Sequence, residues 1–168
     1  SDVGALMSAI NYRIKLQRLE GMVKLKHKTS RRLAPREEKI LERYTRDIVS
    51  YIRDRWPVDT GTSRAAWSWR LDTVEGNYAI NLTNRMYYAS FVHYRGSPKA
   101  PGRHGRWLTP AVYEELVPEA WDKYEARLYA DMAREIIRTE AELAKKQKMG
   151  LVQVVQTFDD IYSQWLAI

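Results

Sequence analysis

Residues 67–82 have the sequence WSWRLDTVEGNYAINL, and this stretch decides the fold class because it predicts two β-strands. Its large apolar side chains alternate with polar or small ones, which is the period of a half-buried strand. The residues Glu75-Gly76-Asn77 separate the two runs, and turn chemistry in that place favours an antiparallel hairpin. The apolar positions are Trp67, Trp69 and Leu71 before the turn and Tyr78, Ile80 and Leu82 after it.

A long helix is expected on each side of the hairpin. The first runs from Pro35 to Trp56, because proline suits the first position of a helix and Pro57 disfavours helical geometry in the residue before it. The second, Pro110–Lys146, carries one apolar face, with Pro118 marking a kink or a break. We therefore expect an α+β fold, in which two long helices are packed on one face of a small antiparallel β-sheet.

Both ends of the chain are expected to add a helix. Near the start, helical spacing relates four apolar residues, Val3, Leu6, Ile10 and Ile14. After Gly150, apolar side chains recur at three-and-four spacing, which is typical of an amphipathic helix. The expected organisation is an N-terminal helical extension with a basic connector at residues 1–34, a core α+β domain at residues 35–147 and a C-terminal amphipathic helix at residues 148–168.

The composition is that of a folded protein with an acidic partner. The chain has 168 residues, of which 45% are apolar and 29% charged, enough for one ordinary core. Its formal charge of +7 favours a nucleic acid or an acidic protein face without choosing between them. It has no cysteine, which excludes disulfides and thiolate metal sites. Ser1–Arg13 lacks the pattern of a secretion signal and no apolar run is long enough for a membrane span, so we expect no membrane contact.

The tripeptide Asp59-Thr60-Gly61 permits two interpretations. Aspartic proteases hold a catalytic carboxylate in such a tripeptide, which would make Asp59 catalytic. That motif requires a preceding apolar strand, whereas Asp59 follows Pro57 at a helix end. The favoured interpretation is a structural turn of Pro57, Asp59, Thr60 and Gly61, in which a side-chain oxygen of Asp59 or Thr60 caps the next short helix and Gly61 relaxes the backbone.

No cofactor or metal site is predicted. His27, His93 and His104 lie far apart in the sequence, and none has a second histidine or a carboxylate at the spacing of a metal site on a helix. The glycines that flank Arg103-His104 lack the strand and helix that a phosphate-binding loop requires.

Two basic clusters, at residues 24–36 and 99–106, are candidates for contacts with phosphates or with an acidic protein. The second belongs to a loop rich in proline and glycine, and Trp107 beside it would stack on a base or anchor the loop in the core. The apolar stripe of the tail either caps the core of its own chain or docks on a neighbour. The candidate interface residues are Arg103, His104, Arg106 and Trp107 in the loop and Phe158, Tyr162, Trp165 and Leu166 in the tail.

Three stretches occur in an order and at a spacing that one protein family shares. PVDTG at residues 57–61, with SRAAW at residues 63–67, looks like that family's P-V-D-T-G turn and its continuation into a strand. Tyr88-Ala89 to Val92, with Gly96-Ser97 after it, is similar to its Y-A-x-x-V-E-x-G-T. RWLTPA at residues 106–111 looks like its P-F-L-x-P-A start of the last long helix. Together they resemble the tail-completion and neck proteins of tailed bacteriophages.

The resemblance implies long helices on an antiparallel sheet and a structural role without cofactor or chemistry. It also implies a homo-oligomeric ring of six or twelve copies at the head-to-tail junction of the virion. Such a ring is assembled in the host cytoplasm and touches other neck, portal or tail proteins. Two alternatives stay open: a basic nucleic-acid-binding module that contacts DNA non-specifically, and an aspartic protease that uses Asp59-Thr60-Gly61.

Overall fold

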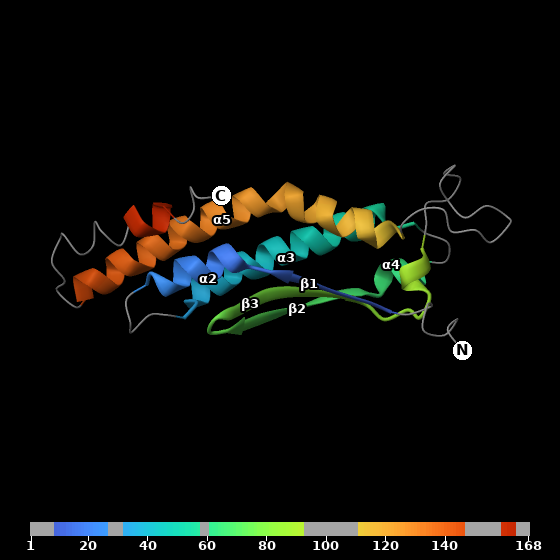
Figure 1. Cartoon of the computed structure of the whole chain (residues 1–168), viewed down its shortest axis with the longest axis horizontal. Coiled ribbons are helices and arrows are strands. Elements are labelled where there is room, and N and C mark those ends of the chain that lie inside the picture. The colour runs from blue at the N-terminus through green and yellow to red at the C-terminus, as the bar shows by residue number, and fades with distance from the viewer. Residues whose placement is uncertain (1–8, 27–31, 58–60, 93–110, 147–158, 164–168) are drawn as a thin grey trace, which may run out of the picture. The chain divides into compact units, whose positions relative to one another are not determined.

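The computed structural model describes residues 9–26, 32–57, 61–92, 111–146 and 159–163 and is a mixture of helix and strand (Figure 1). A helical turn at residues 159–163 follows the last long helix. The elements before it, in chain order, are β1 (Ile10–Lys15), α2 (Gln17–Lys24), α3 (Pro35–Arg55), α4 (Thr62–Ala65), β2 (Trp67–Val74), β3 (Asn77–Asn84), η2 (Ala89–Phe91) and α5 (Val112–Lys146).

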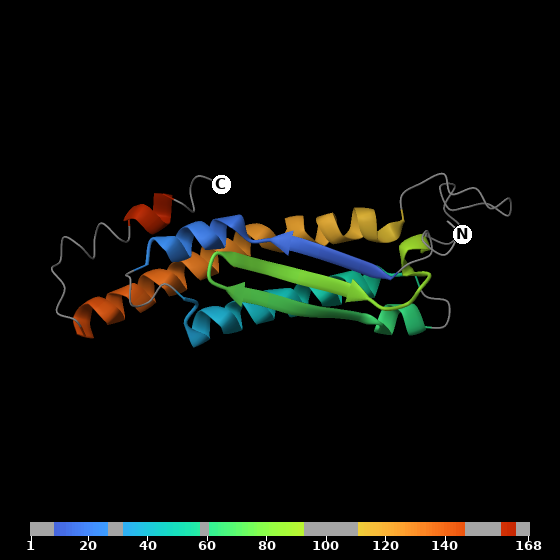
Figure 2. The same ribbon diagram turned by 60° about the horizontal axis from the view of Figure 1, so that its bottom comes forward.

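The three strands form one small antiparallel sheet in the order β1-β3-β2, as Figure 2 shows. β2 and β3 are the predicted hairpin, and only the residues Glu75 and Gly76 separate them. Gly76 has φ of +77°, a left-handed conformation that glycine adopts without a steric penalty. The hairpin prediction is thereby confirmed.

The helix predicted through Ile10 and Ile14 is wrong, because these residues belong to β1, which pairs with β3 at the edge of the sheet. Both side chains are buried, while Asn11 and Arg13 between them are exposed. A spacing of four residues places two side chains on the same face of a helix, and also on the same face of a strand, because four is a multiple of the strand period of two. The two isoleucines alone could therefore not distinguish a helix from a strand. The sequence does form a helix afterwards, at α2.

Both predicted long helices are present. α3 has 21 residues and ends at Arg55, just before the position that Pro57 disfavours. α5 has 35 residues and starts at Val112, while the predicted first residue, Pro110, lies outside the described residues. Of the kink or break predicted at Pro118, the break does not occur, because the helix continues through this residue. Pro118 lies in the second turn of α5, between the fully buried side chains of Val117 and Ala120.

The described residues form two compact units, and each long helix contributes to both. The core of the first unit is centred on Trp56 and Trp67, whose ring centres lie 5.1 Å apart at an interplanar angle of 83°. The indole Nε1 of Trp56 donates to Ser63 Oγ at 2.9 Å, so the buried donor is satisfied. The first unit comprises Ser1–Arg13, Arg46–Arg70 and Asn81–Lys123.

The core of the second unit contains a buried ion pair between Lys26 and Glu37, whose side chains are 1% and 0% exposed. The second unit also buries apolar side chains of α2, such as Leu19 and Met22. The second unit comprises Ile14–Thr45, Leu71–Ile80 and Tyr124–Ile168. β1 and α2 thus supply core residues, while the predicted division into residues 1–34, 35–147 and 148–168 stays a prediction.

Candidate interaction face of the sheet

The side chains of β2 alternate between the helices and the opposite side of the sheet. In the first unit, Trp67 packs on Trp56, which follows the last residue of α3, and the guanidinium carbon of Arg46 in α3 lies 6.0 Å from the ring centre of Trp69. Successive side chains of a strand point to opposite faces. Ser68 and the exposed Arg70 therefore lie on the face of the sheet away from α3.

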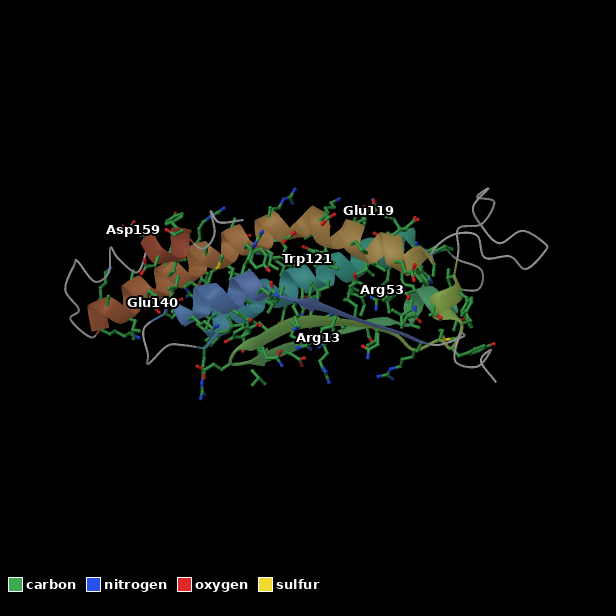
Figure 3. The ribbon with its side chains drawn as sticks, in the orientation of Figure 1. Arg13, Arg53, Glu119, Trp121, Glu140 and Asp159 are labelled. Atoms are coloured by element: carbon green, nitrogen blue, oxygen red, sulfur yellow. The ribbon has the colours of Figure 1, made fainter. Side chains whose placement is uncertain are left out.

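β3 and β1 place further polar groups on that same face. The hydroxyls of Ser68 and Thr83 are 2.7 Å apart, and Arg13 Nη1 donates to Asn81 Oδ1 at 3.1 Å. Figure 3 shows Arg13 on the side of the sheet turned away from the helices. We call this surface the open sheet face, and in the first unit it consists of Asn11, Arg13, Ser68, Arg70, Asn81 and Thr83, with Arg85 at its edge.

A hollow of about 450 Å³ lies on the open sheet face and includes Arg70 and Arg85 among its lining residues. Both arginines are exposed, and none of the described residues that line the hollow is aspartate or glutamate. Arginine guanidinium groups bind carboxylates and phosphates through paired hydrogen bonds. The hydroxyl and amide groups beside them both donate and accept hydrogen bonds. The hollow, which Ala9, Ile10 and Trp69 also line, can therefore bind an anionic group through its arginines.

The predicted structural turn is described only in part. Gly61 has φ of +85° and occupies the N-cap of α4, so its backbone has the relaxed conformation expected of it. The N-cap position carries no side-chain hydrogen bond, since glycine has none to offer. Asp59 and Thr60, the predicted capping and catalytic candidates, lie outside the described residues, whereas Pro57 is half-buried.

Most of the predicted interface residues lie outside the described part of the chain: Arg103, His104, Arg106, Trp107, Phe158, Trp165 and Leu166. Tyr162 is described and is 43% exposed, whereas its neighbour Ile161 is fully buried. The sequence interpretation missed the open sheet face. The sequence signal for this face was the set of polar residues that alternate with apolar ones along the strands, namely Arg70, Asn81 and Thr83. The prediction used only the apolar residues of that alternation.

Two kinds of feature are absent from the described residues. In the ranges that the structure describes, no group of three histidines or carboxylates could hold a metal ion. Within the same ranges, no helix is long and apolar enough to cross a membrane.

Comparison with known proteins gave no match. No protein-family model, curated protein or solved structure matches this chain. The resemblance to the phage tail-completion and neck proteins therefore depends on the three sequence stretches and stays a prediction.

Proposed function

We propose that the chain is a structural, non-enzymatic subunit of a tailed-phage particle and forms part of a ring at the head-to-tail junction. In this proposal, six or twelve copies assemble in the host cytoplasm and contact other neck, portal or tail proteins. In the first unit, Trp69 of β2 lies against Arg46 of α3, and the open sheet face on the opposite side of the strand would supply contacts. The loop at residues 99–106 and the C-terminal tail would supply further contacts between subunits.

One observation carries the proposal, the arrangement of the described residues between α3 and β2. α3 ends at Arg55, Gly61 turns the backbone in the left-handed conformation, and α4 leads directly to β2 at Trp67. Arg64 stabilises this connection, because its Nη2 donates a hydrogen bond to the backbone carbonyl of Asp54 at 2.8 Å. A turn followed by a short basic and apolar segment that enters a strand is the form that the resemblance implies for residues 57–67.

Electron cryomicroscopy of particles of the phage that encodes the chain tests the proposal. We expect a ring of this chain between the capsid vertex and the tail, and we expect particles made without it to accumulate as separate heads and tails. Its absence from purified particles, or normal joining of heads and tails without it, would refute the proposal.

The open sheet face favours a second candidate function, non-specific binding of nucleic acid. Arg13, Arg70 and Arg85 would contact phosphates, and such binding weakens steeply as salt is added. Titration of a labelled DNA duplex at low and at moderate salt separates this candidate from the first. For Asp59 we propose no catalytic role, and a peptidase assay of the wild type beside Asp59→Asn is the corresponding test.

A further inference from the structure

Opposite charges gather on two sides of the first unit. The open sheet face carries the exposed residues Arg13, Arg70 and Arg85. The first part of α5 lies on the other side, as the positions of Glu119 and Arg13 in Figure 3 show. The open sheet face of one molecule is therefore complementary in charge to the α5 side of a second molecule.

The outward side of the first part of α5 carries a stripe of exposed carboxylates, with the exposed cation Lys123 next to it. Glu115, Glu119 and Asp122 are exposed and follow one another at spacings of four and three residues, which places them on one stripe of the helix. Tyr51 of α3 donates its hydroxyl to Glu119 Oε1 at 2.7 Å, and Lys123 Nζ lies 5.0 Å from the centre of the Tyr51 ring. Glu115 and Asp122 extend the acidic stripe on both sides of this cluster.

We infer that the acidic stripe of α5 in one copy docks on the open sheet face of the next copy. The carboxylates of Glu115 and Asp122 then meet the guanidinium groups of Arg70 and Arg85. This inference rests on the proposed function, and it names the two surfaces through which the ring closes. A contact between two different surfaces is head to tail, so it repeats around an axis until the ring is complete.

The location of the two faces supports a second copy as the partner that binds the open sheet face. Both belong to the first unit, so one compact unit supplies the whole repeating contact. A helix laid on a sheet is also a standard way to cover a sheet face. Because the open sheet face is polar and charged, the contact is electrostatic and weakens as salt is added.

The charge pattern favours a second copy over nucleic acid. A phosphate backbone needs only the basic face and gives no role to the acidic stripe of the same unit. The hydroxyl and amide groups of Ser68, Asn81 and Thr83 lie between the arginines and can pair with a carboxylate or with the polar side chains of a helix. A second copy uses both faces at once.

Reversal of the charges on each face tests the inference with the full-length chain. The first variant, Arg70→Glu/Arg85→Glu, makes the sheet face acidic, and the second, Glu115→Lys/Asp122→Lys, makes the helix stripe basic. Arg36→Glu/Arg127→Glu is the matched control, because both arginines are exposed and belong to neither face. Circular dichroism and thermal melting establish that each variant is folded, and sedimentation velocity over a range of concentrations and salt measures association.

We expect the wild type and the control to associate at low salt. Each reversed variant alone should associate about a hundredfold more weakly, because like charges then face each other. An equal mixture of the two reversed variants should regain the association of the wild type, since each then meets a neighbour of opposite charge. Recovery in the mixture is expected only if the two faces contact each other.

Three outcomes overturn the inference. If both reversed variants associate as well as the wild type, other surfaces close the ring, and the proposed function still stands. If the mixture regains nothing, the two faces do not meet. If the wild type is a single subunit at every concentration and is also absent from particles, the inference and the proposed function fail together. Binding of a DNA duplex that Arg70→Glu/Arg85→Glu abolishes, with self-association unchanged, assigns the open sheet face to nucleic acid instead.

Discussion

Lys26 Nζ lies 2.7 Å from Glu37 Oε1 in the core of the second unit, with both side chains almost completely buried. The ammonium also donates to the backbone carbonyl of Arg32 at 2.6 Å. Glu37 accepts from the backbone N–H of Ala34 at 3.0 Å and from the hydroxyl of Thr139 at 3.1 Å. A buried ion pair requires such additional hydrogen bonds. This one joins the end of α2, the start of α3 and α5.

Removal of one partner of this pair is expected to destabilise the chain strongly. Glu37→Ala should lower the free energy of unfolding by about 3–5 kcal/mol, because the charge of Lys26 is left buried without compensation. Replacement of both residues, as Lys26→Met/Glu37→Leu, should cost much less, since no buried charge remains. Urea denaturation measures both. Arg138→Ala, which breaks an exposed ion pair with Glu135, is the control and should leave the midpoint nearly unchanged.

A double variant as unstable as either single variant would contradict this account. It would show that the loss of stability comes mainly from lost packing of the aliphatic parts of the two side chains, and not from an uncompensated charge.

The backbone at Gly61 offers a second prediction. Its φ is +85°, and a Cβ added there would meet nothing within 4 Å. Gly61→Ala should therefore lower the free energy of unfolding by about 1 kcal/mol through backbone strain alone. Gly61→Asn should lower it less, because asparagine tolerates the left-handed conformation. Thermal melting of the two variants beside the wild type checks the order. Equal stability of Gly61→Ala and the wild type would mean that the turn adopts another conformation in solution.

Buried tyrosines make stability depend on pH in the alkaline range. Burial is the main cause that raises the pKa of Tyr44, Tyr78 and Tyr129 above the ordinary value of 10.0. At Tyr44, the hydrogen bond with Asp131 raises the pKa further. Because the pKa is higher in the folded state, each tyrosine contributes its full stabilisation at pH values below its unfolded-state pKa. This stabilisation is lost as the pH rises through the folded-state pKa.

We therefore expect the free energy of unfolding to fall as pH rises above about 10. Tyr129→Phe should flatten this fall, whereas Tyr87→Phe, at a position where the side chain is 65% exposed, should leave it unchanged. Denaturant unfolding at a series of alkaline pH values gives the slopes. Identical slopes for Tyr129→Phe and the wild type would exclude Tyr129 as a source of the effect.

Local pattern was sufficient for the hairpin and for both long helices. Alternation around Glu75-Gly76-Asn77 and the stop at Pro57 are properties of neighbouring residues, so they are readable without the rest of the chain. The strand at β1 was not readable, because Ile10 and Ile14 fit two periods. Only pairing with β3 decides between them.

The open sheet face and the buried ion pair depend on residues distant in sequence. Lys26 looked like one more cation of a basic connector, and only the fold brings Glu37 to Lys26 and Thr139 to Glu37. In the same way, Arg13 and Asn81 meet across two strands that are far apart along the chain. Burial and charge grouping follow from tertiary packing, which pattern alone does not specify.

The C-terminal tail supplies the last prediction, because its two described apolar neighbours have opposite exposures. Ile161 is fully buried, whereas Tyr162 is 43% exposed. In Figures 1 and 2 the helical turn at residues 159–163 lies beside α2 and α5 of the second unit. One side of the tail is thus expected to pack on its own chain, while the side of Tyr162 faces outward.

Ile161→Ala should consequently lower the free energy of unfolding by about 2 kcal/mol or more, because it leaves a cavity in a closed contact. Tyr162→Ala should leave stability almost unchanged and, under the proposed function, reduce the incorporation of the chain into particles, since exposed aromatic side chains are common anchors at interfaces. Urea denaturation measures the first effect, and the amount of chain in purified particles measures the second. If Ile161→Ala unfolds like the wild type but fails to join particles, the buried side of the tail belongs to a contact with a neighbour. If Tyr162→Ala unfolds as easily as Ile161→Ala, both residues hold the tail on its own unit, and the outward side carries no contact.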